Sequence, residues 1–208
     1  MLNKKEQIIK WLKEQGVAEA NIGKIITAFP SILRLSIEAN LNPKVEWLKE
    51  QGIAEGNIGK IITASSQILG LSIEANLKPK VEWLKEQGIA EGNIGKIITA
   101  FPNILGFSIK RLEEQIEVLK NFNVDTTDLL TNYPRHLMNS VQTIYAKMMF
   151  VQNKMSFGEE DTIEKKLKIL KMPWTNFKKQ YGISKEDLFA MYPLPEEFTN
   201  NQDRGVVR

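Results

Sequence analysis

The sequence predicts an all-α fold, a superhelical solenoid of helical repeats, and three observations carry that prediction. Residues 17–52 align with residues 53–88 without a gap, and 29 of the 36 positions are identical. Apolar residues inside the repeat recur at helical spacing, and no segment shows the alternating pattern of a strand. A unit of this size cannot bury its apolar face alone, so successive units are expected to stack.

The residues at its two ends predict the first helix of the repeat. Pro79 is followed by KVEWLKEQ and then by Gly88. Proline is favoured at the first helical position and glycine just past the last, so we expect a helix of about nine residues. The chain opens with the same half-unit, IIKWLKEQG.

A second helix follows in AEGNIGKIITA. Ile94, Ile97, Ile98 and Phe101 have the i, i+3, i+4, i+7 spacing of a one-sided amphipathic helix. Pro102 disfavours helical geometry at the residue before it, and the NILGFS that follows is long enough only for a short 3₁₀ helix. Each unit is therefore predicted to hold two α-helices and a 3₁₀ helix.

Ser36 and Ser72 are predicted to cap the IEANL segments that lead into the next unit. In the third copy, SIKRLEEQIEVLK lacks the internal proline, so one unbroken helix is expected from about residue 108 to 120. The rest of the chain is expected to supply helices in VQTIYAKMMFV, EDTIEKKLKIL and WTNFKKQYGI, followed by a half-repeat at 182–193.

These elements predict a single solenoid over residues 1–208, beginning with an N-terminal half-repeat. The expected parts are 1–16 (half-repeat), 17–52, 53–88 and 89–123 (repeats), 124–198 (divergent repeats and C-terminal cap) and 199–208 (flexible tail).

The amino-acid composition excludes several classes of functional site. The 208 residues contain no Cys and one His, which excludes disulfides, thiolate metal sites, cysteine nucleophiles and zinc sites built on several histidines. No nucleophile, base and acid can be assembled around the single His, so we expect neither enzymatic activity, nor a metal, nor a cofactor. No apolar stretch is long enough to cross a bilayer, and the N-terminus resembles neither a signal nor a transit peptide.

The repeat resembles that of the mitochondrial transcription termination factor (mTERF) family. The resemblance lies in GIAEGNIGKIITAFPNILGFSIK and LKPKVEWLKEQG, where the proline before the short helix, the NLKPK entry and the LKEQG exit recur at fixed spacing. It implies an arc of helices that binds double-stranded DNA or RNA along a basic concave groove and regulates gene expression.

The sequence departs from the family pattern in its charge. Each of the units 17–52, 53–88 and 89–123 carries four basic and four acidic residues. A bacterial relative, a trimmed mature chain, or a scaffold that has left nucleic acid behind would each fit. The expected location is the cytoplasm of a bacterium, or an organelle matrix if a transit peptide has been removed.

Lys24, Lys60 and Lys96 form one column of the repeat and are the leading candidates for phosphate contact. Each lies two residues beyond the first core Ile, about 200° round the helix from the buried stripe. None has an acidic residue at i−4 or i+4, so each ammonium group is available to a phosphate. The alternative is a row of solvated lysines that serves solubility.

A second set of cations lies near the short closing helices, where it could face a groove or simply be solvated: Arg34, Lys110, Arg111, Arg135 and His136. Trp11, Trp47 and Trp83 form a ladder that is expected to pack between helices rather than stack on bases. Other lysines follow a Glu by three residues and are expected to form surface ion pairs: Lys49 with Glu46, Lys85 with Glu82 and Lys120 with Glu117. The lysines at 165–171 follow acidic residues and are expected to be a solvated face.

Together these features favour a non-enzymatic, monomeric protein that binds nucleic acid through its shape and phosphates, with no membrane partner. With only five Arg residues, base readout is expected to be minor. The alternative is a protein–protein interaction scaffold on the same solenoid, which the charge balance of each repeat favours.

Overall fold

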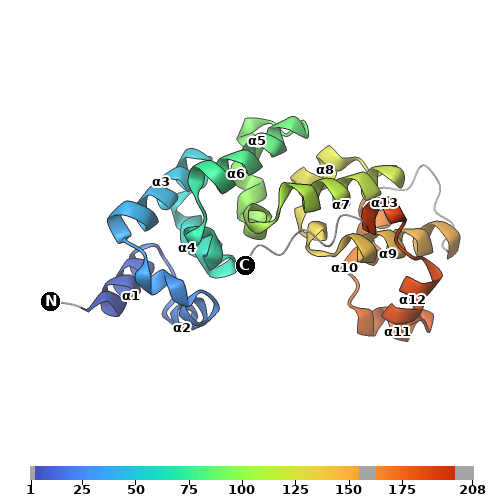
Figure 1. Cartoon of the computed structure of the whole chain (residues 1–208), viewed down its shortest axis with the longest axis horizontal. Coiled ribbons are helices and arrows are strands. Elements are labelled where there is room, and N and C mark those ends of the chain that lie inside the picture. Colours follow the sequence, from blue (N-terminus) through green and yellow to red (C-terminus); the bar gives the residue numbers. More distant parts are fainter. Residues whose placement is uncertain (1–2, 155–162, 200–208) are drawn as a thin grey trace. The chain divides into compact units, whose positions relative to one another are not determined.

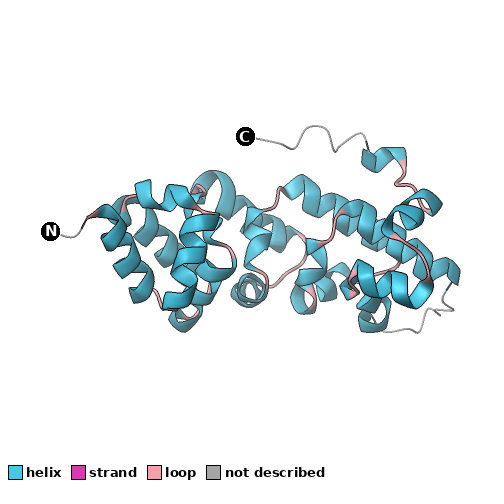
Figure 2. Ribbon diagram, turned by 90° about the horizontal axis from the view of Figure 1, so that it is seen from below, coloured by secondary structure: helices cyan, strands magenta, loops and turns pink. Residues whose placement is uncertain are grey.

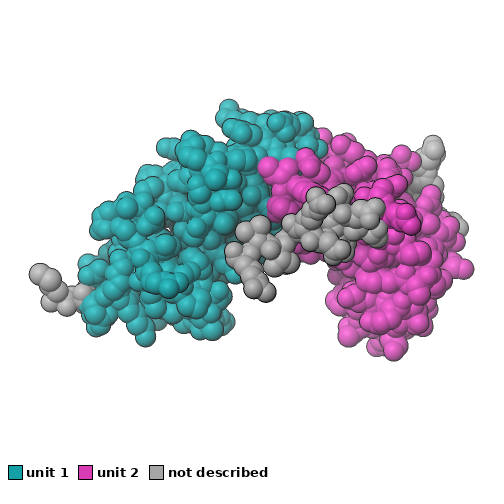
Figure 3. Space-filling view, viewed as in Figure 1, with its two compact units in different colours: residues 1–107 teal, residues 108–208 magenta. Residues whose placement is uncertain are grey.

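The computed structural model describes residues 3–154 and 163–199 and divides the chain into two compact units, residues 1–107 and 108–208 (Figures 1 and 3). All regular elements among the described residues are helical, which confirms the predicted all-α class (Figure 2). The first unit holds α1 (Lys4–Glu14), α2 (Glu19–Ala28), η1 (Pro30–Arg34), η2 (Ile37–Leu41), α3 (Asn42–Glu50), α4 (Glu55–Ala64), η3 (Ser66–Gly70), η4 (Ile73–Leu77), α5 (Lys78–Glu86), α6 (Glu91–Ala100) and η5 (Pro102–Gly106). The second holds α7 (Ile109–Asn121), α8 (Thr126–Asn132), η6 (Pro134–Met138), α9 (Val141–Lys154), α10 (Ile163–Lys171), α11 (Trp174–Tyr181), α12 (Lys185–Met191) and α13 (Glu196–Thr199).

Each repeat of the first unit contains the helices that its sequence predicts. The first helices end before Gly52 and Gly88, whose φ angles of 80° and 82° are the left-handed values that favour glycine. The second helices end at the residue before Phe29 or Phe101, and a 3₁₀ helix begins at the proline that follows. The predicted division of the unit into two α-helices and a 3₁₀ helix is confirmed.

A π-helical turn connects each 3₁₀ helix to the first helix that follows it, at η2 and η4 of the first unit. The Ser36 and Ser72 side chains accept hydrogen bonds from the amides of Ala39 and Ala75, as a helix cap does. The turn runs directly into α3 or α5, where Pro43 or Pro79 lacks an N–H and would press on the carbonyl four residues earlier in a regular helix. The wider π turn relieves that pressure.

The third repeat tests this explanation because it has no proline at the equivalent place. There Ser108 caps α7 through the amide of Arg111, and α7 then runs unbroken from Ile109 to Asn121. The sequence predicted this helix with its boundaries shifted by one residue.

The repeats of residues 1–107 stack through their second helices. Helix α2 packs on α4 and α4 on α6, and the 3₁₀ helices η1, η3 and η5 pack on one another in the same order. Helices α1, α3 and α5 make fewer contacts among themselves and follow the other side of this unit (Figure 1). The row of α2, α4 and α6 is therefore the closely packed side, and we call its exposed surface the inner face.

Two glycines allow the second helices α4 and α6 to lie close to the ends of the preceding first helices, α1 and α3. A Cβ atom on Gly59 would lie 2.4 Å from the backbone C and O of Gly16, and one on Gly95 would lie 2.6 Å from the Gln51 carbonyl oxygen. Gly23, in the first repeat, has nothing within 4 Å of the same position. Gly59 and Gly95 therefore let the backbone at the ends of α1 and α3 lie directly against α4 and α6.

In the second unit, α9 packs against α7, α10 and α12. Its Lys147 is almost fully buried, with Nζ donating to the Met172 carbonyl at 2.6 Å and lying 4.5 Å from the centre of the Trp174 ring. Burial lowers the pKa of Lys147 to about 8. The helices predicted in this region are present, and α13 was not predicted; the expected flexible tail lies outside the described residues beyond residue 199.

Candidate nucleic-acid interface

Lys24, Lys60 and Lys96 occupy equivalent positions on α2, α4 and α6, and all three side chains are exposed on the inner face. Buried isoleucines such as Ile58 and Ile61 cover the opposite side of each helix. Because α4 contacts both α2 and α6, the three lysines form a row across residues 1–107.

The lysine row is not neutralised by carboxylates. Lys60 and Lys96 make hydrogen bonds of 3.3 and 3.4 Å to the side-chain oxygens of Asn57 and Asn93, one helical turn earlier. Over the described ranges 3–154 and 163–199, no carboxylate oxygen lies within 4 Å of any of the three ammonium groups. Each can therefore meet an anion without first breaking an ion pair.

A second column of lysines, Lys13, Lys49 and Lys85, is engaged in ion pairs with glutamates. Lys13 and Lys85 bind Glu19 and Glu91 at 2.7 Å, and Lys49 contacts both Glu46 and Glu55. The pairs Lys13–Glu19, Lys49–Glu55 and Lys85–Glu91 link the end of a first helix to the start of the second, whereas Lys49–Glu46 lies within α3. The hydrogen bond and charge of Lys13 lower the pKa of Glu19, and those of Lys85 lower the pKa of Glu91.

The predicted ion pairs are only partly correct. Lys49 does contact Glu46, at 3.2 Å. The partner of Lys85 is Glu91, six residues later, rather than the predicted Glu82, because the short loop brings the Glu91 carboxylate to 2.7 Å from Lys85 Nζ. Within the described ranges, Lys120 makes no ion pair.

The cations near the 3₁₀ helices have different roles. Arg34, at the end of η1, and Lys110, in the first turn of α7, are exposed. Arg111 is half-buried and donates to the Met138 carbonyl at 3.3 Å, so its guanidinium group fastens α7 to η6. Burial lowers the pKa of Arg111. Arg135, on η6, is exposed.

His136 is buried in the second unit, which corrects the expectation that it could face a groove together with Arg135. Its ring is 3% exposed, and Nδ1 lies 2.8 Å from the Tyr133 carbonyl oxygen. Burial is the main cause that lowers the pKa of His136, because the charged ring loses its contact with water. It belongs to the core of the second unit.

The tryptophan ladder is buried, as predicted. Trp11, Trp47 and Trp83 are each at most 5% exposed. Trp11 donates from Nε1 to the Asn42 side-chain oxygen at 2.8 Å, which ties α1 to α3. These rings are therefore unavailable for stacking on bases.

A basic hollow of about 650 Å³ lies along α10 and α11 in the second unit, and sequence reasoning missed it. Lys168, Lys171 and Lys179 line it together with the amides of Asn176 and Gln180. Lys171 Nζ also lies 5.7 Å from the centre of the Tyr133 ring. Of the acidic residues expected to neutralise this segment, those at 159–161 lie outside the described residues, and Glu164, in the first turn of α10, is not among the residues that line the hollow.

The described residues contain neither a candidate metal site nor a candidate membrane-spanning helix. The described residues contain no group of His, Asp and Glu arranged to hold a metal ion. None of the helices in the described ranges is long and apolar enough to cross a membrane.

Comparison with known proteins gives a family. No curated protein matches the chain. The mTERF family model matches residues 2–192. This family comprises nucleic-acid-binding, transcription-related repeat proteins that are generally not enzymes. The repeated proline-led 3₁₀ helices, the stacked second helices and this match together show that the chain belongs to the mTERF family.

Proposed function

We propose that the protein binds double-stranded DNA or RNA through phosphate contacts on the inner face of residues 1–107 and thereby regulates transcription. The observation that supports this is the row of Lys24, Lys60 and Lys96, exposed on three contacting helices and unpaired with carboxylates over the described ranges. Neighbouring packed helices lie about 10 Å apart, so the row spans about 20 Å. That is roughly six base pairs of a duplex.

Phosphate contact makes a quantitative prediction about salt. Each neutralised phosphate adds about −0.9 to the slope of log K against log salt concentration for duplex DNA, so three lysines contribute about −2.7. A fourfold increase in salt then weakens this contribution about 40-fold. Sequence preference is expected to be weak, because lysine reads phosphate charge rather than the pattern of base edges.

The basic hollow of α10 and α11 is a second phosphate-binding surface in this proposal. Lys168 and Lys179 are exposed at its wall, and no carboxylate of the described residues lies among the side chains that line it.

The test is a titration of labelled duplex DNA and duplex RNA, followed by fluorescence anisotropy, with the wild type and a K24Q/K60Q/K96Q variant. The variant is expected to lose about 3 from the magnitude of the salt slope and at least tenfold in affinity at low salt. K13Q/K49Q/K85Q is the matched control, because it removes the same charge from lysines already paired with Glu19, Glu55 and Glu91. Equal losses in both triple variants, or no binding of either duplex at low salt, would contradict the proposal.

A further inference from the structure

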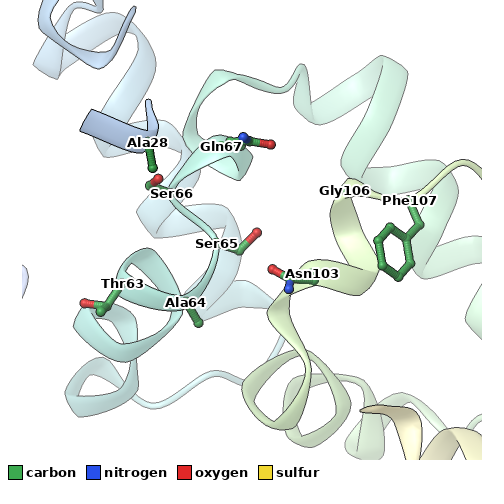
Figure 4. A pocket seen from close by; sticks show the side chains of 9 residues that line it. All are labelled: Ala28, Thr63, Ala64, Ser65, Ser66, Gln67, Asn103, Gly106 and Phe107. Atoms are coloured by element: carbon green, nitrogen blue, oxygen red, sulfur yellow. The ribbon is translucent and has the colours of Figure 1, made fainter. Parts of the chain in front are cut away.

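A cavity of about 340 Å³ opens in residues 1–107 where the second repeat departs from the others (Figure 4). The first and third repeats have Phe29-Pro30 and Phe101-Pro102 after the second helix, whereas the second repeat has Ser65-Ser66. Ser65 and Ser66 both line the cavity. The cavity therefore lies where the repeat has replaced a ring by two hydroxyl groups.

The first repeat shows what fits in the equivalent space. The Phe29 ring lies over Gly70 of the next repeat so closely that a Cβ atom on Gly70 would be 2.7 Å from the end of the ring. One repeat later the equivalent pair is Ser65 and Gly106, and a Cβ atom on Gly106 would have nothing within 4 Å. Gly106 thus leaves the same space for an aromatic ring as Gly70 does, but Ser65, the residue equivalent to Phe29, has no ring to fill it.

The walls of the cavity define the chemistry of an occupant. Gly106 and the half-buried Phe107 ring supply apolar surface, and Ser65, Ser66, Gln67 and Asn103 supply hydroxyl and amide groups. Ser65 and Asn103 point toward one another at one side, with the Phe107 ring standing at the other (Figure 4). Among the described residues that line the cavity, none carries a charge. A cavity of about 150 Å³ is enough to hold benzene, so a single aromatic ring with a polar substituent fits.

We propose that this cavity binds one aromatic side chain, of Tyr or Phe, presented by a partner protein. The occupant of the equivalent space in the first repeat is itself a Phe side chain, which gives the shape of the site. The large hydrophobic side chains exposed among the described residues of this chain are Met138 and Met191, which carry no ring, so the proposal assigns the ring to a different protein.

A nucleobase is the weaker candidate. In a duplex each base is stacked and paired, so entry into the cavity would cost a few kcal/mol of unstacking. An aromatic side chain on a protein surface needs no such opening, and aromatic residues that fill pockets are the usual anchors of protein interfaces. The cavity borders the end of α4, one turn beyond Lys60, so a protein bound there would also approach the inner face.

The test uses N-acetyl-tyrosinamide and N-acetyl-phenylalaninamide as probes, with thymidine and cytidine in parallel, followed by amide chemical shifts in the full chain. Either amino-acid probe is expected to shift the signals of Ser65, Gly106 and Phe107, with a dissociation constant on the order of 1 mM for a single ring. S65F is expected to weaken binding at least tenfold, because the new ring occupies the site as Phe29 does over Gly70.

F29S is the reciprocal variant and is expected to create a second site, detected as new shifts at Gly70. Its circular dichroism spectrum checks that it remains folded, and S65F tests the proposal independently of that result. Binding of the nucleosides in place of the amino-acid probes would overturn the proposal in favour of a base site. No binding of any probe, together with a higher melting temperature in S65F, would overturn it in favour of an unfilled gap in packing.

Discussion

Replacing the glycine inside a second helix by alanine should have opposite effects in different repeats. In G23A the new methyl group meets nothing within 4 Å, so the only expected effect is the better helix propensity of Ala, which stabilises by about 1 kcal/mol. In G59A the same gain applies, but the methyl group would lie 2.4 Å from the backbone of Gly16.

The size of the clash follows from these distances. Ordinary van der Waals contact begins at 3.4 Å, so the backbone at Gly16 must retreat by about 1 Å or the helices must separate. Backbone atoms cannot rotate away as a flexible side chain can. Overpacking of this kind costs about 1–3 kcal/mol, and that cost is the expected difference between G59A and G23A.

Urea unfolding measures this difference. Three of the four tryptophans, Trp11, Trp47 and Trp83, are buried in residues 1–107, so most of the fluorescence change reports the unit that contains both glycines. The unfolding midpoints of the two variants should be separated by roughly 1 M urea, with G23A above the wild type and G59A below it. A G59A midpoint equal to that of G23A would refute the inference that Gly59 permits close stacking.

Further predictions concern single contacts in both units. N42A should lower the free energy of unfolding by about 1 kcal/mol, because it leaves the buried Trp11 Nε1 without its acceptor, and chemical unfolding should show a smaller loss for K78A, whose pair with Glu74 is exposed. Lys147 has a pKa near 8 in the folded chain and 10.5 when unfolded, so the unfolded state binds more protons between these values and stability should rise as pH rises from 8 to 10.5. Thermal unfolding of K147M across this range should lack that contribution, and an identical pH dependence in both proteins would exclude Lys147 as its source. K168Q/K179Q should reduce the magnitude of the salt slope for duplex binding by about 2, and an unchanged slope would remove the basic hollow from the interface.

Most of the helices could be predicted because the residues that mark helix boundaries recur in successive copies of the repeat. Proline and glycine mark both ends of α5, and the missing proline in the third copy correctly predicts the unbroken α7. The exposure of Lys60 and the burial of Trp47 also follow from helical geometry, since each depends on residues of its own helix.

Features that depend on the neighbouring repeat could not be predicted in the same way. The partner of Lys85 depends on how the following loop places Glu91. In the sequence, the cavity is visible only as Ser65-Ser66 in place of the Phe-Pro of the other repeats. That this exchange opens a cavity becomes clear only from the structure, where Phe29 lies over Gly70.

The contact between the inner face and phosphates can be measured directly by limited acetylation of the lysines, with and without duplex DNA, followed by mass spectrometry. We predict that saturating duplex slows the modification of Lys24, Lys60 and Lys96 several-fold, whereas Lys13 and Lys85, paired with Glu19 and Glu91, react at the same rate in both samples. Unchanged reactivity of Lys24, Lys60 and Lys96 in the bound protein would contradict the account.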